Sequence, residues 1–147
     1  MHKNTEENIY PVIDTIVLDL NERKKTELIG NDLLFLNYKK NESRLIFKNK
    51  FLTAPFALGI LYVVEGSSLG GRYILKNVET ISGLDKQKGV SYFTGYGTKT
   101  GTYWKNFITI LTTYEQNNNC GDTIIEGAVY AFESIYNHFR SQNKNED

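Results

Sequence analysis

Residues 66–71 of this chain, with the sequence GSSLGG, place three glycines and two hydroxyl side chains inside an otherwise helical stretch. Each glycine in a helix costs about 1 kcal/mol relative to alanine. Two gains could offset that cost. A backbone without Cβ atoms lets a flat ligand or a second helix approach closely, and it lets the helix bend. From the residues alone, helix packing through small residues and close approach of a ligand both remain open.

The side chains able to bind a metal are few. The chain has one cysteine, which excludes an internal disulfide and any cysteine-based metal cluster. Cys120 follows three asparagines, so we expect it in a surface loop. His2 lies beside Met1 in a segment without an apolar stripe, and His138 lies on the last predicted helix. For both histidines we expect an exposed or packed side chain rather than a metal ligand.

Composition narrows the class of protein. Lysine plus arginine and aspartate plus glutamate number 17 each, so no net field favours nucleic acid or an anionic membrane. No apolar run has the length of a signal peptide or a membrane span. We therefore expect a cytoplasmic protein with no nucleic-acid and no membrane partner. A chain of 147 residues fits one domain over residues 1–147, with frayed ends at 1–8 and 141–147.

The spacing of apolar residues predicts an all-α fold. Residues recur at three- and four-residue intervals in five segments, which are 9–23, 28–36, 54–78, 104–116 and 123–139. Polar or glycine-rich composition predicts connections at 37–53, 82–89 and 95–101. A short strand over residues 45–47 is the alternative within the first of these connections.

Three segments carry a family resemblance. Residues 62–71, with the sequence YVVEGSSLGG, closely resemble the distal-helix signature of bacterial haem oxygenases, especially those allied to bacteriophytochromes. Residues 92–97 followed by 104–107 (YFTGYG and WKNF) resemble the family's downstream motif, and residues 25–33 resemble a segment that precedes the distal helix. The resemblance covers most of the chain in the same order, and it implies a haem-oxygenase-like helical bundle.

The same resemblance implies an activity and a site. Haem would be both substrate and cofactor, and it would be cleaved to biliverdin, carbon monoxide and iron with electrons from an external donor such as a reductase or ferredoxin. Gly66, Ser67 and Gly70 would be the catalytic residues of the distal helix over the haem, with Ser67 ordering distal water. Gly71 would help the helix flex, and Tyr62 would reach a haem propionate. Arg72 is expected to face solvent, and the aromatic side chains of Trp104 and Phe107 are expected in the core.

One departure from the family pattern leaves the iron ligand open. The family's ligand is a histidine on a proximal helix near the N-terminus, and neither His2 nor His138 occupies that position, so we expect an N-terminally shortened bundle. Three interpretations follow: a haem oxygenase read from a truncated start, a shortened relative that still binds haem or a bilin through the distal half with a partner chain completing the pocket, and a structural remnant that retains the packing glycines and binds no tetrapyrrole. The alternative to a haem oxygenase is therefore a non-catalytic haem- or bilin-binding or protein-interaction module that retains the fold. A homo-oligomer would be the simplest cover for the face left by missing helices.

Overall fold

The computed structural model describes residues 1–39, 45–48, 52–78, 80–81, 83–84 and 88–142. These ranges contain helices and turns without a β-strand, which confirms the all-α prediction. None of their helices is long and apolar enough to cross a bilayer. In chain order the elements are α1 (His2–Asn4), a π-helical turn (Thr5–Ile9), α2 (Tyr10–Ile13), a 3-10 turn (Leu20–Arg23), α3 (Thr26–Phe35), α4 (Ala54–Val78), α5 (Ser91–Thr94), a second 3-10 turn (Gly97–Lys99), α6 (Thr100–Asn118) and α7 (Gly121–Gln142).

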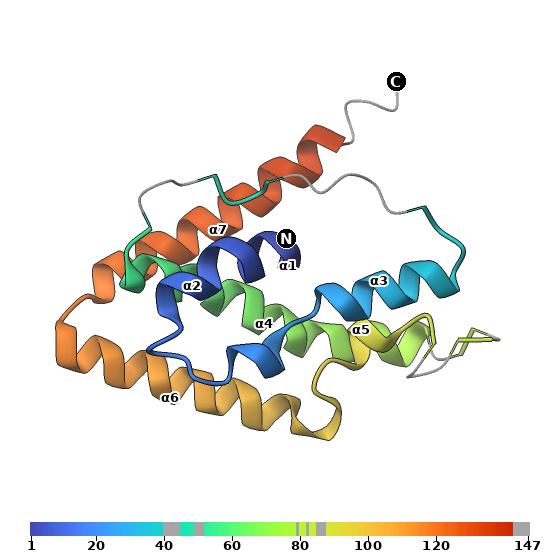
Figure 1. The fold of residues 1–147 in the computed structure, drawn as a ribbon, viewed down its shortest axis with the longest axis horizontal. Coiled ribbons are helices and arrows are strands. Elements are labelled where there is room, and N and C mark those ends of the chain that lie inside the picture. The colour runs from blue at the N-terminus through green and yellow to red at the C-terminus, as the bar shows by residue number, and fades with distance from the viewer. Residues whose placement is uncertain (40–44, 49–51, 79, 82, 85–87, 143–147) are drawn as a thin grey trace.

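Helix α4 is the centre of the fold, as Figure 1 shows, and it packs against α2, α5, α6 and α7. Its bounds agree with the predicted helix at 54–78. Its first half is apolar nearly all round, which is typical of a helix surrounded by others. The fully buried side chains of this core come from α4, the N-terminal segment and α6, and include Leu58, Ile60, Leu61, Ile9, Ile13 and Phe107.

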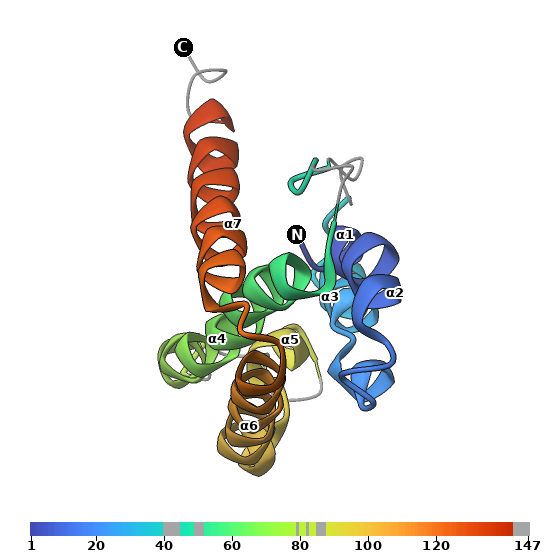
Figure 2. The same cartoon turned by 90° about the vertical axis from the view of Figure 1, so that its left-hand side faces the viewer.

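Helices α4 and α7 cross in backbone contact at two glycines that the sequence motif does not include. A Cβ atom on Gly59 would lie 2.0 Å from the carbonyl oxygen of Ile124, and one on Gly127 would lie 2.1 Å from that of Phe56. Only glycine fits at such distances. Beyond the crossing, α7 runs away from α4, and α1–α3 lie along another flank of α4 (Figure 2).

The N-terminal segment differs from its prediction in two ways. The helix predicted over residues 9–23 ends at Ile13, and after a turn the chain forms the 3-10 turn at Leu20–Arg23. The break brings the side chain of Arg23 into the interior, where it pairs with acidic groups. Residues 1–8, expected to be frayed, are helical from His2 onward, because the side chain of Asn4 is buried and its Oδ1 accepts hydrogen bonds from the backbone of residues 46 and 47.

The connections follow the predicted pattern where they are described. Residues 45–48 form a loop, so the alternative of a strand there was wrong. Gly95 and Gly97 have φ values of 57° and 59°, which explains glycine at both positions. Helix α6 begins at Thr100, earlier than expected, and α7 still includes residues 141 and 142. Residues 143–147 and parts of the predicted connections at 37–53 and 82–89 lie outside the described residues.

Candidate functional site

Two of the hollows that border the GSSLGG segment of α4 are lined by its glycines, and the larger of these two is a groove of about 620 Å³. Its floor is formed by Tyr62, Gly66 and Ser67 of α4, and the ring of Trp104 from α6 adjoins them. Helix α7 supplies one wall through an apolar face that includes Phe132, Ile135 and Phe139, and Met1 and Ile46 also contribute. We call this hollow the α4–α7 groove.

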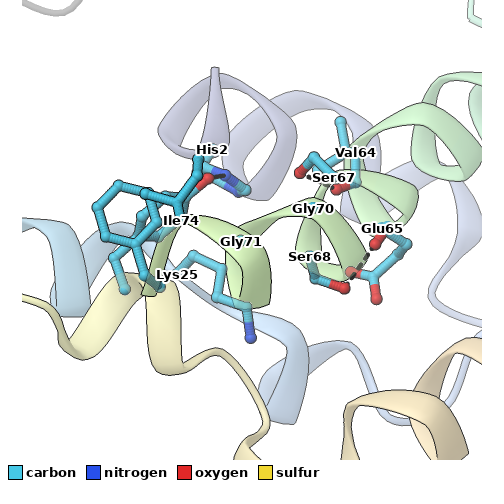
Figure 3. A pocket seen from close by; sticks show the side chains of 11 residues that line it. His2, Lys25, Val64, Glu65, Ser67, Ser68, Gly70, Gly71 and Ile74 are labelled. Atoms are coloured by element: carbon cyan, nitrogen blue, oxygen red, sulfur yellow. Dashed lines mark hydrogen bonds between the residues drawn. The ribbon is translucent and has the colours of Figure 1, made fainter. Parts of the chain in front are cut away.

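The second hollow is a cavity of about 250 Å³ between α4, α1 and α5, which we call the His2 cavity (Figure 3). It is lined by Ser67, Ser68, Gly70 and Gly71 along α4, and by His2 and Tyr92 across from them. His2 Nε2 lies 2.9 Å from the hydroxyl of Tyr92. Burial lowers the pKa of His2 to about 4, with smaller contributions from the N-terminal ammonium and Lys25, so its imidazole is neutral at pH 7. His2 is thus a packed side chain, as expected.

The structure divides the predicted site residues between these two hollows. Tyr62 and Gly66 border the α4–α7 groove, Gly70 and Gly71 border the His2 cavity, and Ser67 borders both. The division follows from helix geometry, because each step of four residues turns by about 40° around the helix axis. Gly70 therefore faces further round α4 than Tyr62 does, and one ligand in the groove does not meet all five residues.

The glycines of the motif are not explained by helix packing within this chain. A Cβ atom on Gly66 would meet only the ring of Trp104, at an ordinary contact distance of 3.6 Å. Apart from the adjoining residues and backbone of α4 itself, no described atom lies within 4 Å of the corresponding position on Gly70, and the nearest to that on Gly71 is the carbonyl oxygen of Phe93 at 3.6 Å. The packing glycines are Gly59 and Gly127, so the space at Gly66 and Gly70 favours approach of a ligand.

The polar and aromatic residues near the groove are partly exposed. Ser67 donates a hydrogen bond from Oγ to the carbonyl of Val64 at 2.6 Å, which leaves its oxygen able to accept one from a bound group. Tyr62 is 39% exposed, and its ring lies 5.4 Å from that of Trp104. Trp104, expected in the core, is half-buried and lines the groove, whereas Phe107 is fully buried as predicted. Arg72 is exposed, also as predicted.

A buried polar cluster adjoins the motif, and sequence reasoning missed it. Glu65, directly before Gly66, accepts hydrogen bonds from Arg23 Nη1 at 2.7 Å and from the Tyr96 hydroxyl at 2.9 Å. Burial raises the pKa of the Glu65 carboxyl, and the nearby Arg23 and the Tyr96 hydrogen bond oppose that rise. Arg23 also holds both carboxylate oxygens of Asp19, at 2.7 and 2.8 Å. The available signal was that Glu65 is the only charged residue between 54 and 71.

A second buried carboxylate joins the other two segments that carry the family resemblance. Asp32 of α3 accepts hydrogen bonds from the backbone N–H groups of Ser91 and Tyr92, at 2.9 and 2.8 Å. It thereby caps the first turn of α5. Residues 25–33 and 92–97 are thus held together beside α4, and Tyr92 in turn contacts His2. The three segments form one neighbourhood in space.

Comparison with known protein families matches residues 46–141 to the family described as Heme oxygenase. The match includes α4 to α7, and so it includes the α4 lining of both hollows, but not His2 and Lys25 of the one or Met1 of the other. A search of curated proteins found no match. Among the described residues, no group of three or more His, Cys, Asp or Glu side chains is placed to hold a metal ion on its own.

Proposed function

Since the chain belongs to the haem oxygenase family, we propose that it binds haem in the α4–α7 groove and, with an external electron donor, cleaves it to biliverdin, carbon monoxide and iron. When bound, the haem supplies the iron at which dioxygen is activated. The contribution of the chain is to seat the macrocycle, shield it from bulk water and order polar groups beside it.

The observation that carries this proposal is the open glycine surface at the floor of an apolar groove. The groove volume of about 620 Å³ falls within the range of about 300 to 1,000 Å³ that is usual for ligand pockets. The His2 cavity, at about 250 Å³, falls below it. The floor at Gly66 carries no side chain, and the walls are mainly aromatic and aliphatic, which suits a flat macrocycle with an apolar body.

Each groove residue has a proposed role. Gly66 lets a ligand approach the backbone of α4, and Ser67, with its exposed hydroxyl, orders water at that surface. Tyr62 offers its hydroxyl to a propionate. The rings of Phe132 and Phe139 exclude water from the macrocycle. Gly70 and Gly71, behind this face, leave α4 free to bend when the product departs, because the His2 cavity gives that part of the helix space.

The alternative function is non-catalytic binding of haem or a bilin. The same groove supports it, because apolar walls bind a tetrapyrrole without requiring iron or electrons. Either function predicts binding, and only the first predicts turnover, so the two are separated by one series of measurements on the same sample.

The test is a titration of the purified chain with haemin, followed by Soret absorbance and by tryptophan fluorescence. Trp104 is the only tryptophan and it borders the groove, so binding there should quench it strongly. We expect a saturable one-to-one complex. Gly66→Leu should abolish it, whereas Gly30→Leu, on α3 where an added Cβ atom would have no neighbour within 4 Å, should not.

Addition of a reductase or ferredoxin system then tests catalysis. Appearance of biliverdin absorbance and carbon monoxide supports the enzymatic function. A stable haem complex without turnover, together with saturable binding of biliverdin, supports the non-catalytic alternative. No saturable haemin binding, or binding that leaves Trp104 fluorescence unchanged and is equal in Gly66→Leu, overturns the assignment to this groove.

A further inference from the structure

The wall of the α4–α7 groove contains one imidazole. His138 of α7 borders the groove, together with Ile135 and Phe139 on the same face of that helix. Its neighbours across the groove floor are Gly66 and Ser67 of α4. The chain has two histidines, and the other, His2, lines the separate cavity.

Helical spacing explains why His138 shares a wall with the apolar residues. Phe132, Ile135 and Phe139 are three, four and seven residues apart, which places them along one stripe of α7. His138 lies three residues after Ile135, at the edge of this stripe. It also borders a more polar hollow with Lys48 and Asn137, so the imidazole stands at the boundary between the apolar groove and a polar rim.

The imidazole of His138 is available for coordination. The side chain is half-buried, its ring contacts that of Phe139 in an edge-on arrangement, and neither ring nitrogen has a hydrogen-bond partner among the described residues. In contrast, the Nε2 atom of His2 is engaged by Tyr92. Neutral imidazole nitrogen is the protein ligand most often used for haem iron in oxygen-binding proteins.

From this placement we infer that His138 is the axial ligand of iron when haem occupies the α4–α7 groove. The inference rests on the proposed function, because it requires haem in that groove. Other side chains that can ligate haem iron are less well placed or chemically weaker: Met1 offers only a thioether, Tyr62 is a phenol needing deprotonation, and Cys120 lies at the α6–α7 junction outside the groove lining.

The experiment uses haemin with the full chain and four variants: His138→Ala, His138→Gln, His2→Ala and Tyr62→Phe. Circular dichroism and thermal unfolding establish that each variant folds. We expect His138→Ala and His138→Gln to bind haemin about tenfold more weakly or worse, equivalent to about 1.4 kcal/mol or more. The resonance Raman spectrum of the reduced complex should lose its iron–imidazole band in both. Free imidazole should restore that band, and the other two variants should retain it.

The outcomes separate the ligand from the function. If the chain binds haemin but the iron–imidazole band is unchanged in both His138 variants, the assignment of His138 is overturned and haem binding stands. If the band disappears only in His2→Ala, the ligand is His2 and the inference is likewise overturned. If the unaltered chain shows no saturable binding of haemin, the proposed function fails, and the inference fails with it.

Discussion

Arg23 and Glu65, 42 residues apart in the sequence, form a buried ion pair in which Nη1 lies 2.7 Å from Oε2. The exposed fractions of the two side chains are 0% and 4%. Glu65 directly precedes Gly66, so the pair fixes the N-terminal segment against the turn of α4 that carries the glycine motif. The Tyr96 hydroxyl, from the segment before α6, completes the hydrogen bonding of the carboxylate.

We expect Glu65→Ala to reduce the free energy of unfolding by about 3 kcal/mol, because it leaves the guanidinium of Arg23 buried with one carboxylate partner fewer. Urea denaturation followed by circular dichroism measures this change. Glu7→Ala is the matched control, since Glu7 pairs with Lys3 on the surface, and its effect should stay below about 1 kcal/mol. Equal changes in the free energy of unfolding for the two substitutions would show that the buried ion pair stabilises the fold no more than the surface pair does.

The two classes of helical glycine should respond to alanine in opposite directions. Gly59→Ala places a Cβ atom against the backbone of α7 and should destabilise the fold by about 2 kcal/mol or more, or prevent folding. Gly70→Ala has free space and should stabilise α4 by about 0.5 to 1 kcal/mol. Thermal unfolding of both variants tests this, with Gly30→Ala as a second stabilising case. A loss of stability in Gly70→Ala would contradict the conclusion that an added Cβ atom has free space at this position.

The buried histidine makes stability depend on pH in a defined window. Burial lowers the pKa of His2 from 6.5 to about 4, so between these values the unfolded chain binds more protons than the folded chain. The free energy of unfolding therefore falls as the pH drops from 6.5 to 4, by up to about 3 kcal/mol from this group. Urea denaturation at pH 7, 5.5 and 4.5, without haemin, should show a weaker dependence in His2→Gln than in the unaltered chain.

Tyr62 allows a test of the groove floor that leaves its shape intact. If its hydroxyl binds a propionate, Tyr62→Phe should weaken haemin binding by about 1 kcal/mol, or about fivefold, without changing the melting temperature of the apo chain. Fluorescence titration through Trp104 provides the affinity. Tyr136→Phe, on an exposed part of α7, serves as the control. If Tyr62→Phe and the unaltered chain bind haemin with equal affinity, the Tyr62 hydroxyl does not bind a propionate.

Sequence patterns predicted the helical class and the bounds of α4, because a helix that is packed on all sides by others consists of a long run of apolar residues. The same patterns failed over residues 9–23. The apolar residues there keep a helical spacing, but the helix ends early and the chain turns so that the side chain of Arg23 is buried. They located the glycine motif but not its division between two hollows, which depends on how α7 crosses α4. The position of His138 on the groove wall depends on the same crossing. The single domain, the cytoplasmic location and the homo-oligomer stay predictions.

The contact at Gly59 and Gly127 also determines where the far end of α7, with His138, lies relative to α4. His138 lies eleven residues beyond Gly127, about 16 Å along α7 at 1.5 Å per residue. A rotation of about 5° at the glycines would therefore carry His138 sideways by about 1.5 Å while hardly moving the contact itself. Side chains beside the crossing hold its angle, since the rings of Phe56 and Tyr130 lie 5.4 Å apart there. The width of the groove at His138 therefore depends on the crossing angle that the close contact at Gly59 and Gly127 sets.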